Sequence, residues 1–340
     1  MIIAQHHIKI ADASHPGEAR RAAARLAEKL AFGDTRAGEL SIVVMELANN
    51  VLAHAVSGEM LLLGWQKGST KGVDVFALDK GPGIADLQHS LADGYSTVGT
   101  PGNGLGAISR LASGFDVYSN PSQGTALFAR ILSKRSGAAC DGNLEVGCVL
   151  APIHGESVCG DGLSFYGQGK RYICIAVDGL GHGVGAAEAT EVAIRVFDEN
   201  RDKAPERIVQ RLHLALRATR GAVAAIAEID LDRRKIRYCG VGNISGYILA
   251  TGKSQSLVSH NGTVGHVMTR TVELEYDFPS NSILVLHSDG LTSQWSLDKY
   301  AGLSRRHPGL IAGVLYRDFK RGRDDASVMA IRERAEGNGA

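Results

Sequence analysis

Two sets of acidic, amide and glycine residues occur in this chain of 340 residues, one in each half. The first set comprises Glu46-Leu47-Ala48-Asn49-Asn50, Asp79-Lys80-Gly81-Pro82-Gly83 and Gly102-Asn103-Gly104-Leu105-Gly106. The second set comprises Gly160-Asp161, Val177-Asp178-Gly179, Ser288-Asp289-Gly290-Leu291 and Asp324-Asp325. The first set predicts a site that binds a nucleotide. The second predicts a site that holds metal ions and hydrolyses a phosphoester.

The residue types of the first set match what binding ATP requires. Asp79, at the end of a predicted strand, can accept a hydrogen bond from the exocyclic amine of adenine, and Gly81 and Gly83 allow a tight turn beside the base. Magnesium uses few protein ligands besides phosphate and water, and the amide oxygen of Asn50 suits that role. Glu46 lies one helical turn before Asn50 and could orient or deprotonate an attacking hydroxyl.

The glycines Gly102, Gly104 and Gly106 precede or begin a predicted helix, whose N-terminal amides favour phosphate. Each motif alone has a simpler explanation, because a Gly-x-Gly-x-Gly segment occurs in many loops, and Glu46 and Asn50 alone would be solvated helix residues. The order and spacing of the three motifs together favour the nucleotide site.

The second set could hold a pair of divalent cations. Asp161, Asp178, Asp289 and Asp324 each lie at or near a predicted strand end or turn, where carboxylates from distant segments can converge. Two such ions would lower the pKa of a water molecule and neutralise phosphate oxygens. Gly179 lacks a side chain, so its carbonyl can approach a metal. A single Asp-Gly pair is usually only a turn, and the prediction depends on four aspartates in this order between strands.

Composition excludes several other classes of protein. The net charge of +1, from 37 basic and 36 acidic residues, argues against a nucleic-acid binder. No apolar run is long enough for a membrane span, and the N-terminus lacks the features of a signal peptide. Five cysteines without a Cys-x-x-Cys spacing argue against structural zinc and disulfides, and favour a cytoplasmic protein.

Hydrophobic periodicity predicts an α+β protein with a change of character near its middle. In the first half we expect helices at His15–Phe32 (with Gly33 as its C-cap), Thr35–Ala55 and Leu105–Leu111, and strands at Met60–Trp65, Val73–Leu78, Phe115–Tyr118 and Ala126–Ile131. Residues 133–143 have the composition of a linker, which separates domains at 1–132 and 144–340.

Strands dominate the second half and flank paired helices, which indicates a two-layered sheet sandwich covered by helices. The expected strands are Val146–Leu150, Leu163–Tyr166, Tyr172–Val177, Ala222–Ile229, Ile236–Cys239, Ser245–Leu249, Val272–Tyr276, Ile283–His287 and Val328–Ile331. The expected helices are Ala186–Phe197, Ile208–Ala218 and Leu310–Phe319.

Residues 1–132 resemble a known family. The three motifs of the first set, with Gly124-Thr125, resemble the four boxes of the GHKL (Bergerat) ATP-binding fold, an α/β sandwich. The segment from Asp79 to Gly106 resembles the small serine-kinase switch proteins of bacterial stress regulation (RsbT-type). The resemblance implies that Asn50 holds Mg²⁺, that Asp79 binds adenine with Thr125 also at the nucleotide, that Glu46 is the catalytic base, and that residues 84–106 form a lid. It also implies a serine or threonine on a STAS-domain protein as the phosphate acceptor.

Residues 145–333 resemble the type 2C metal-dependent serine/threonine phosphatases, an α-β-β-α sandwich, and most closely their compact stress-pathway branch (RsbX-type). The motifs that carry this resemblance are Val177-Asp178-Gly179-Leu180-Gly181-His182-Gly183, Ser288-Asp289-Gly290-Leu291-Thr292 and Arg323-Asp324-Asp325-Ala326-Ser327. It implies two Mn²⁺ or Mg²⁺ ions, with Asp178 bridging and with Asp161, Asp289 and either Asp324 or Asp325 completing the site.

Three further positions follow from the same resemblance. His182 is either a proton donor to the leaving oxygen or a positioning residue. Asn243 belongs to a turn with a structural role, and Ser293 stands where the branch often has an acidic residue.

The leading hypothesis is a bifunctional regulator, a kinase joined to a phosphatase, that acts on STAS-domain phosphoproteins of a stressosome-like complex. The alternative is that the first half is an ATP-gated binding module without catalysis and that only the phosphatase is an enzyme. A nucleotide-hydrolysing protein of another kind is disfavoured, because neither half carries a Gly-x-x-x-x-Gly-Lys-[Ser/Thr] loop.

Overall fold

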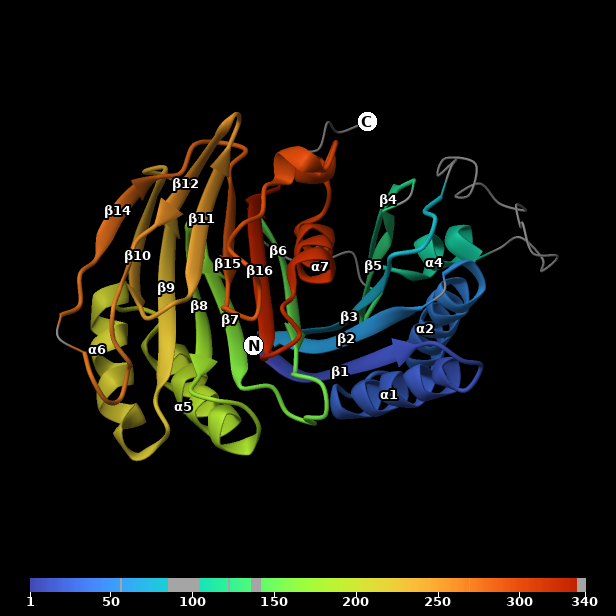
Figure 1. The fold of residues 1–340 in the computed structure, drawn as a ribbon, viewed down its shortest axis with the longest axis horizontal. Coiled ribbons are helices and arrows are strands. Elements are labelled where there is room, and N and C mark those ends of the chain that lie inside the picture. Colours follow the sequence, from blue (N-terminus) through green and yellow to red (C-terminus); the bar gives the residue numbers. More distant parts are fainter. Residues whose placement is uncertain (56, 85–103, 122, 136–141, 269, 335–340) are drawn as a thin grey trace. The chain divides into compact units, whose positions relative to one another are not determined.

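The computed structural model describes residues 1–334 except 56, 85–103, 122, 136–141 and 269 (Figure 1). The chain divides into two compact units. The first unit comprises Met1–Cys140 together with Arg305–Arg317, and the second comprises Asp141–Ser304 together with Asp318–Ala340. Both units combine helices with antiparallel sheets, which confirms the predicted α+β class. None of the described helices is both long enough and apolar enough to cross a membrane.

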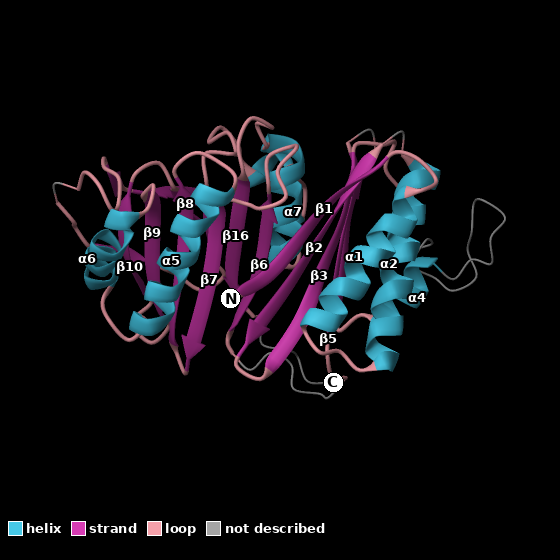
Figure 2. Ribbon diagram, turned by 90° about the horizontal axis from the view of Figure 1, so that it is seen from below, coloured by secondary structure: helices cyan, strands magenta, loops and turns pink. Residues whose placement is uncertain are grey.

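The first unit contains a five-stranded antiparallel sheet with the strand order β1-β2-β3-β5-β4. Its strands are β1 (Ile2–Ile10), β2 (Gly58–Lys67), β3 (Thr70–Asp79), β4 (Gly114–Asn120) and β5 (Gly124–Leu132). Within the part of the chain that the structure describes, three helices cover one face of this sheet, as Figure 2 shows for the first two: α1 (His15–Lys29), α2 (Asp34–His54) and α4 (Gly104–Leu111).

Alternation along the strands separates two apolar faces of this sheet. Val75 and Ala77 of β3 are buried in the core that the sheet forms with α1, α2 and α4. Phe76 and Leu78 alternate with them and are also buried, so the opposite face needs a cover of its own. That cover is helix α7 (Pro308–Phe319), whose residues up to Arg317 belong to this unit.

The second unit contains two antiparallel-rich sheets (Figure 2). The five-stranded sheet has the order β12-β11-β15-β16-β6, and the six-stranded sheet has the order β13-β10-β9-β8-β7 with β14 paired to β10. Helices α5 (Val184–Asn200) and α6 (Pro205–Ala215) pack on the six-stranded sheet through a shared apolar core. The strands are β6 (Leu144–Ala151), β7 (Asp161–Gln168), β8 (Arg171–Gly179), β9 (Ala222–Asp230), β10 (Lys235–Val241), β11 (Ser245–Ala250), β12 (Lys253–Leu257), β13 (Ser259–His260), β14 (Leu274–Asp277), β15 (Ile283–His287) and β16 (Ala326–Glu333).

Several sequence-based expectations differ from these elements. Strand β1 was not expected, because its run carries two histidines and two further polar residues that weaken the apolar signal. Gly33 does not cap the first helix, which ends at Lys29. It precedes α2 in an extended conformation and is the N-cap of that helix. The helix expected at Ile208–Ala218 starts at Pro205 and ends at Ala215, and a 3-10 turn follows at Leu216–Ala218.

Candidate functional site

Helices α2 and α4 bring together three residues of the predicted nucleotide site. Glu46 and Asn50 lie one turn apart on α2, and Gly104 is the first residue of α4. A Cβ atom on Gly104 would lie 3.7 Å from Oε2 of Glu46 and 3.9 Å from Oδ1 of Asn50. The carboxylate and the amide therefore face the start of the glycine-containing helix.

Asp79 ends β3 with its carboxylate held in a fixed orientation. It is 9% exposed, and its Oδ1 accepts hydrogen bonds from the backbone N–H of Gly81 at 2.7 Å and of Thr125 at 3.2 Å. Both bonds end on the same oxygen, so Oδ2 takes no part in either. Thr125 Oγ1 lies 3.0 Å from Ser119 Oγ, which links the start of β5 to the end of β4.

The glycines around Asp79 are required by close backbone approaches. Gly124 has a φ of +86°, and a Cβ atom there would lie 2.1 Å from the carbonyl oxygen of Asp79. Gly83 has a φ of +77°, and its Cβ would lie 2.5 Å from the carbonyl oxygen of Asn120. A Cβ on Gly81 would lie 3.1 Å from the carbonyl oxygen of His54, at the end of α2. These residues form one continuous edge of the first unit.

The other two glycines of the nucleotide motif are Gly102 and Gly106. Gly106 is buried within α4. Gly102 lies outside the described residues, as do most of the residues 84–106 expected to form a lid.

In the second unit, Asp161 and Asp178 lie directly opposite each other on β7 and β8. Asp161 is 4% exposed, and its Oδ2 has no hydrogen-bond partner among the described residues. Burial raises the pKa of Asp161 to about 7. Burial, followed by the charge of Asp161, raises the pKa of Asp178 to about 9. The pair therefore holds a proton near neutral pH.

Asp289 and Asp324 add two more carboxylates to the electrostatic surroundings of Asp178. Both contribute to the raised pKa of Asp178, after burial and Asp161. Burial raises the pKa of Asp289 itself, and the charge of Asp324 raises it further. Oδ2 of Asp289 accepts a hydrogen bond of 2.8 Å from the side-chain amide of Asn243.

The adjacent Asp325 has a different environment from Asp324. It is 2% exposed, and its two oxygens accept hydrogen bonds of 2.7 Å from the backbone N–H groups of Ile153 and Gly160. Asp324 is partly exposed, and its Oδ1 accepts from the backbone N–H of Asp325 at 2.9 Å. Asp325 thus ties three segments of backbone together with both of its oxygens.

The donor set of this region suits hard divalent cations. Among the residues that the structure describes, no three His, Cys, Asp or Glu side chains are already arranged as a metal site. The buried Oδ2 of Asp161 nevertheless lacks a partner there, and burial followed by repulsion from nearby carboxylates raises the pKa of Asp178. A cation would satisfy that oxygen and remove the repulsion. Gly179 ends β8 where a Cβ would lie 2.3 Å from the carbonyl oxygen of Ala186, so only glycine fits there.

His182 lies in the loop between β8 and α5, beside a residue that the sequence did not single out. Its Nδ1 is 2.8 Å from Oε1 of Glu156, and its side chain is 57% exposed. The carbonyl of His182 accepts a weak hydrogen bond of 3.5 Å from Arg220. Glu156 therefore orients the imidazole.

Sequence reasoning also missed the contact of Asn243 with the site. A structural role in a turn was expected, but its amide holds the carboxylate of Asp289. The sequence signal was the Gly242-Asn243 pair, since Gly242 has a φ of +96° that turns the chain directly after β10.

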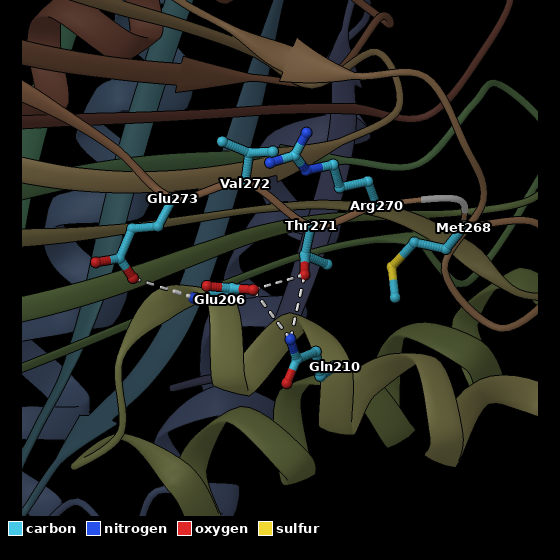
Figure 3. A pocket seen from close by; sticks show the side chains of 7 residues that line it. All are labelled: Glu206, Gln210, Met268, Arg270, Thr271, Val272 and Glu273. Carbon is cyan, nitrogen blue, oxygen red and sulfur yellow. Dashed lines mark hydrogen bonds between the residues drawn. The ribbon is translucent and has the colours of Figure 1, made fainter.

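A cavity of about 620 Å³ lies elsewhere in the second unit, beside α6 (Figure 3). It is lined by Glu206, Gln210, Met268, Arg270, Thr271, Val272 and Glu273. Glu206 accepts hydrogen bonds from Gln210 and Thr271, so these polar groups satisfy one another (Figure 3). None of the residues predicted for the two sites lines it.

Comparison with known proteins also separates an N-terminal from a C-terminal part, although the C-terminal match includes Arg305–Arg317, which pack with the first unit in the structure. The model of the histidine kinase-like ATPase domain matches residues 10–131, and the model of stage II sporulation protein E (SpoIIE) matches residues 168–334. The serine/threonine-protein kinase RsbT of Bacillus subtilis is 32% identical over 111 residues, which cover 33% of this chain and 84% of that protein. By its first domain, the chain belongs to the RsbT family.

The second domain has its own relatives. The phosphoserine phosphatase RsbX of Bacillus subtilis is 29% identical over 154 residues, which cover 40% of this chain and 69% of that protein. A solved chain described as "The bacterial stressosome: a modular system that has been adapted to control secondary messenger signaling" is 26% identical, with a TM-score of 0.53, and covers 56% of this chain and all of that one. RsbX in complex with magnesium has a TM-score of 0.50 at 22% identity, over 56% of this chain and 96% of that one, which shows the fold alone.

The predicted resemblances are confirmed by these matches. The first domain is a GHKL-type, RsbT-like ATPase domain, and the second is a type 2C phosphatase domain related to RsbX and SpoIIE. The chain therefore joins homologues of a kinase and of a phosphatase, which in Bacillus subtilis are two separate proteins.

Proposed function

We propose that this chain is a bifunctional cytoplasmic regulator that adds and removes phosphate on serine or threonine of STAS-domain partners in a stressosome-like complex. The observation that carries the proposal is the group of carboxylates around Asp161, with its unpartnered buried oxygen among the described residues, in a domain related to RsbX. The RsbT-like domain supplies the opposite activity.

In the first domain, ATP binds between the end of β3 and the start of α4. Oδ2 of Asp79 accepts a hydrogen bond from the adenine amine, since Oδ1 is already engaged by Gly81 and Thr125. The first turn of α4, which begins at Gly104, would present backbone amides to the phosphates. Asn50 contributes its amide oxygen to the Mg²⁺ that accompanies ATP.

Glu46 takes the proton from the attacking hydroxyl. Its carboxylate faces the start of α4 beside Asn50, so it lies on the phosphate side of the site. General-base assistance of this kind contributes about 10²–10⁴-fold to a rate. A module that only binds its partner would have no use for a carboxylate at this position.

In the second domain, Asp161, Asp178, Asp289 and Asp324 would hold two Mn²⁺ or Mg²⁺ ions, with the carbonyl of Gly179 as an additional ligand. Such ions lower the pKa of water and neutralise phosphate oxygens during hydrolysis. Asp178 would be the central ligand of this set, because burial and then the charges of the neighbouring aspartates raise its pKa. Asn243 keeps the carboxylate of Asp289 in a fixed orientation.

We assign the ligand role to Asp324 rather than to Asp325. Both oxygens of Asp325 accept backbone hydrogen bonds, and a metal would have to displace them at the cost of two buried N–H groups. His182 is exposed and paired with Glu156, so it can give a proton to the leaving oxygen or position the substrate. The pH dependence of hydrolysis in His182→Gln separates these two roles.

The test is a phosphate-transfer experiment with the full chain. We expect transfer of radiolabelled phosphate from ATP to a candidate STAS-domain protein when hydrolysis is silenced by Asp289→Asn. We expect this signal to disappear in Asp289→Asn/Glu46→Gln. The phosphorylated STAS protein should then lose its label to the unsubstituted chain in the presence of Mn²⁺.

The outcomes separate the proposal from its alternative. Bound nucleotide without transfer to any STAS partner would leave the first domain as an ATP-gated binding module. Unchanged Mn²⁺-dependent hydrolysis in Asp178→Asn would refute the metal assignment.

A further inference from the structure

Helix α7 is a late segment of the sequence that folds with the first domain. Its residues Pro308 to Arg317 are buried, and they belong to the first unit although the rest of the sequence around them belongs to the second. A Cβ on Gly309 would lie 2.6 Å from the ring of Phe128, and a Cβ on Gly313 would lie 3.2 Å from the ring of Phe76. Two glycines four residues apart thus bring the helix backbone close to the sheet face that α1, α2 and α4 leave open.

Polar contacts give this packing a defined position. His307 stacks on Phe128 with ring centroids 4.4 Å apart, and its backbone N–H donates to Asp116 at 2.7 Å. Near the other end of the helix, Tyr316 donates a hydrogen bond of 3.2 Å to the carboxylate of Glu59 on β2. The helix is therefore held at both ends as well as along its glycine face.

The last contact of α7 with the first unit reaches the nucleotide site. Arg317 is 3% exposed, and its Nη1 donates a hydrogen bond of 3.2 Å to the carbonyl oxygen of Asp79. The side chain of Asp79 is oriented by Gly81 and Thr125, and Arg317 orients its peptide group. A buried, charged donor on this carbonyl thus fixes the residue that we assign to adenine.

Beyond Arg317, the chain goes directly into contact with the loop that follows Asp289. The carbonyl of Phe319 accepts from the N–H of Thr292 at 2.9 Å, and Lys320 forms a β-bridge with Leu291. The N–H of Arg321 donates to the carbonyl of Gly290 at 2.7 Å. One residue separates Arg317 from Phe319, and Asp324 follows three residues after Arg321.

We infer that Arg317 is a positioning residue of the nucleotide site and that residues 317–324 couple this site to the phosphatase metal loop. The inference rests on the proposed function, since it takes Asp79 as the adenine ligand and Asp289 and Asp324 as metal ligands. A nucleotide that moves the peptide of Asp79 shifts Arg317, and the short connection passes that shift to the 289–292 loop. Binding linkage is reciprocal, so occupancy of either site changes affinity at the other by the same factor.

The test uses the full chain and measures the coupling in both directions. In one direction, the dissociation constant for Mn²⁺ is obtained from the dependence of p-nitrophenyl phosphate hydrolysis on free Mn²⁺, with and without a saturating non-hydrolysable ATP analogue. In the other direction, the affinity for a fluorescent ATP analogue is compared between the unsubstituted chain and Asp289→Asn. We expect a change of about fivefold or more in each, the lower end of common couplings.

Variants of α7 distinguish coupling from support of the fold. In Arg317→Met, the fold-change in each direction should fall to one, while nucleotide binding and hydrolysis stay measurable. Arg317→Lys keeps a hydrogen-bond donor and should restore part of the coupling. Tyr316→Phe is the matched control, because it removes a hydrogen bond from the same helix to the same sheet that ends on the side chain of Glu59 and not on the peptide group of Asp79. It should keep the full coupling. Thermal unfolding of each variant verifies that the fold is intact.

Each result has one interpretation. If neither ligand changes the affinity for the other in the unsubstituted chain, while phosphate transfer and hydrolysis are both present, the coupling is overturned and the proposed function stands. Equal loss of coupling in Arg317→Met and Tyr316→Phe also overturns it, because α7 would then act only through stability. Nucleotide affinity that is unchanged in Asp79→Asn instead refutes the nucleotide assignment itself, and the coupling with it.

Discussion

Replacing Asp161 by asparagine should affect stability in opposite directions with and without metal. Oδ2 of Asp161 is buried without a hydrogen-bond partner among the described residues, and the carboxylate faces Asp178 across two paired strands. Without a cation, this charge opposes folding. With a cation bound, the same charge is what holds the metal. The Asp161→Asn substitution would therefore relieve the repulsion and weaken the metal site.

The magnitude follows from the raised pKa. Burial raises the pKa of Asp161 from 3.8 to about 7, and each unit corresponds to about 1.4 kcal/mol. The unfolded chain ionises near pH 4 while the folded chain keeps its proton to about pH 7. Stability of the metal-free protein is therefore full below pH 4 and falls as the pH rises to about 7, by about 4 kcal/mol in total.

The amide of the variant stays neutral at every pH and avoids that loss. Burying an amide with incomplete hydrogen bonding costs about 1–3 kcal/mol. The net gain at pH 8 in chelator should therefore be about 1–3 kcal/mol. For a domain of this size it raises the unfolding temperature by roughly 2–10 °C. At pH 4 the variant should be no more stable than the unsubstituted chain.

Differential scanning calorimetry of the full chain at pH 4 and pH 8, in chelator and in Mn²⁺, measures these shifts. Mn²⁺ at 100 times its dissociation constant should stabilise the unsubstituted chain by about 2.7 kcal/mol, and the variant by less. Asp74→Asn is the matched control, since Asp74 is equally buried but paired with Arg130 at 2.7 Å. It should destabilise the protein under every condition. If Asp161→Asn destabilises the protein in chelator at pH 8 and still gains full stability from Mn²⁺, the carboxylate is not a metal ligand.

Further substitutions test individual residues. Asp79→Asn should weaken binding of a fluorescent ATP analogue by about tenfold or more, as expected for a lost hydrogen bond to a charged group. Glu46→Gln should lower the kcat of phosphate transfer by at least about 100-fold with little change in the KM for ATP. Gly124→Ala should destabilise the first domain in urea by more than about 2 kcal/mol, because its φ is +86° and its Cβ would lie 2.1 Å from a carbonyl oxygen. Asp324→Asn should abolish hydrolysis in a folded protein, whereas Asp325→Ala should unfold at lower urea concentration because it leaves two buried N–H groups unpaired.

Each of these results could contradict the assignment behind it. Equal transfer rates in Glu46→Gln would support a binding module in place of a kinase. If Asp325→Ala is folded but inactive and Asp324→Asn is active, then Asp325 and not Asp324 is the metal ligand.

Local sequence signals predict how most residues of the first candidate site are oriented. Glu46 and Asn50 are one turn apart on a helix with a clear apolar face, so their common direction follows from helical geometry alone. Asp79 ends a strand of alternating residues and is followed by two glycines, so its turn could be read directly. That these residues lie near Gly104 was predicted from the order of the three motifs along the chain. Each motif alone would not have predicted a nucleotide site.

Contacts between distant segments could not be predicted in the same way. Asn243 and Asp289 are 46 residues apart and meet only because β11 pairs with β15. Glu156 and His182 are 26 residues apart, in two loops without a common pattern. Nothing in the local sequence of Asn243 or Glu156 specifies these partners, because hydrophobic periodicity predicts which face of an element is buried and not what covers it.

The two adjacent aspartates before β16 show what structure adds to a correct motif. Both residues lie just before β16, with Asp324 in a bend, and their carboxylates have different partners. The sequence left both open, since both are carboxylates at a strand start. In the structure Asp325 uses both oxygens on Ile153 and Gly160, and it thereby holds the start of β7, where Asp161 lies. Asp325 thus supports the backbone of the proposed metal site, and Asp324 is the one that we propose as a ligand.

Periodicity also failed to predict which sheet helix α7 packs against. Its periodicity predicted a helix over Leu310–Phe319, but all of its residues from Pro308 to Arg317 are buried, so no polar face indicated which sheet it covers. The informative residues were Gly309 and Gly313, whose spacing of four places both on one face for a close approach to aromatic rings. Glycine inside a helix costs about 1 kcal/mol relative to alanine, and that cost is offset only if a neighbour occupies the space. A late helix with two such glycines therefore indicates a tightly packed partner outside its immediate sequence surroundings, and here the partner is the sheet whose strand β3 ends at Asp79.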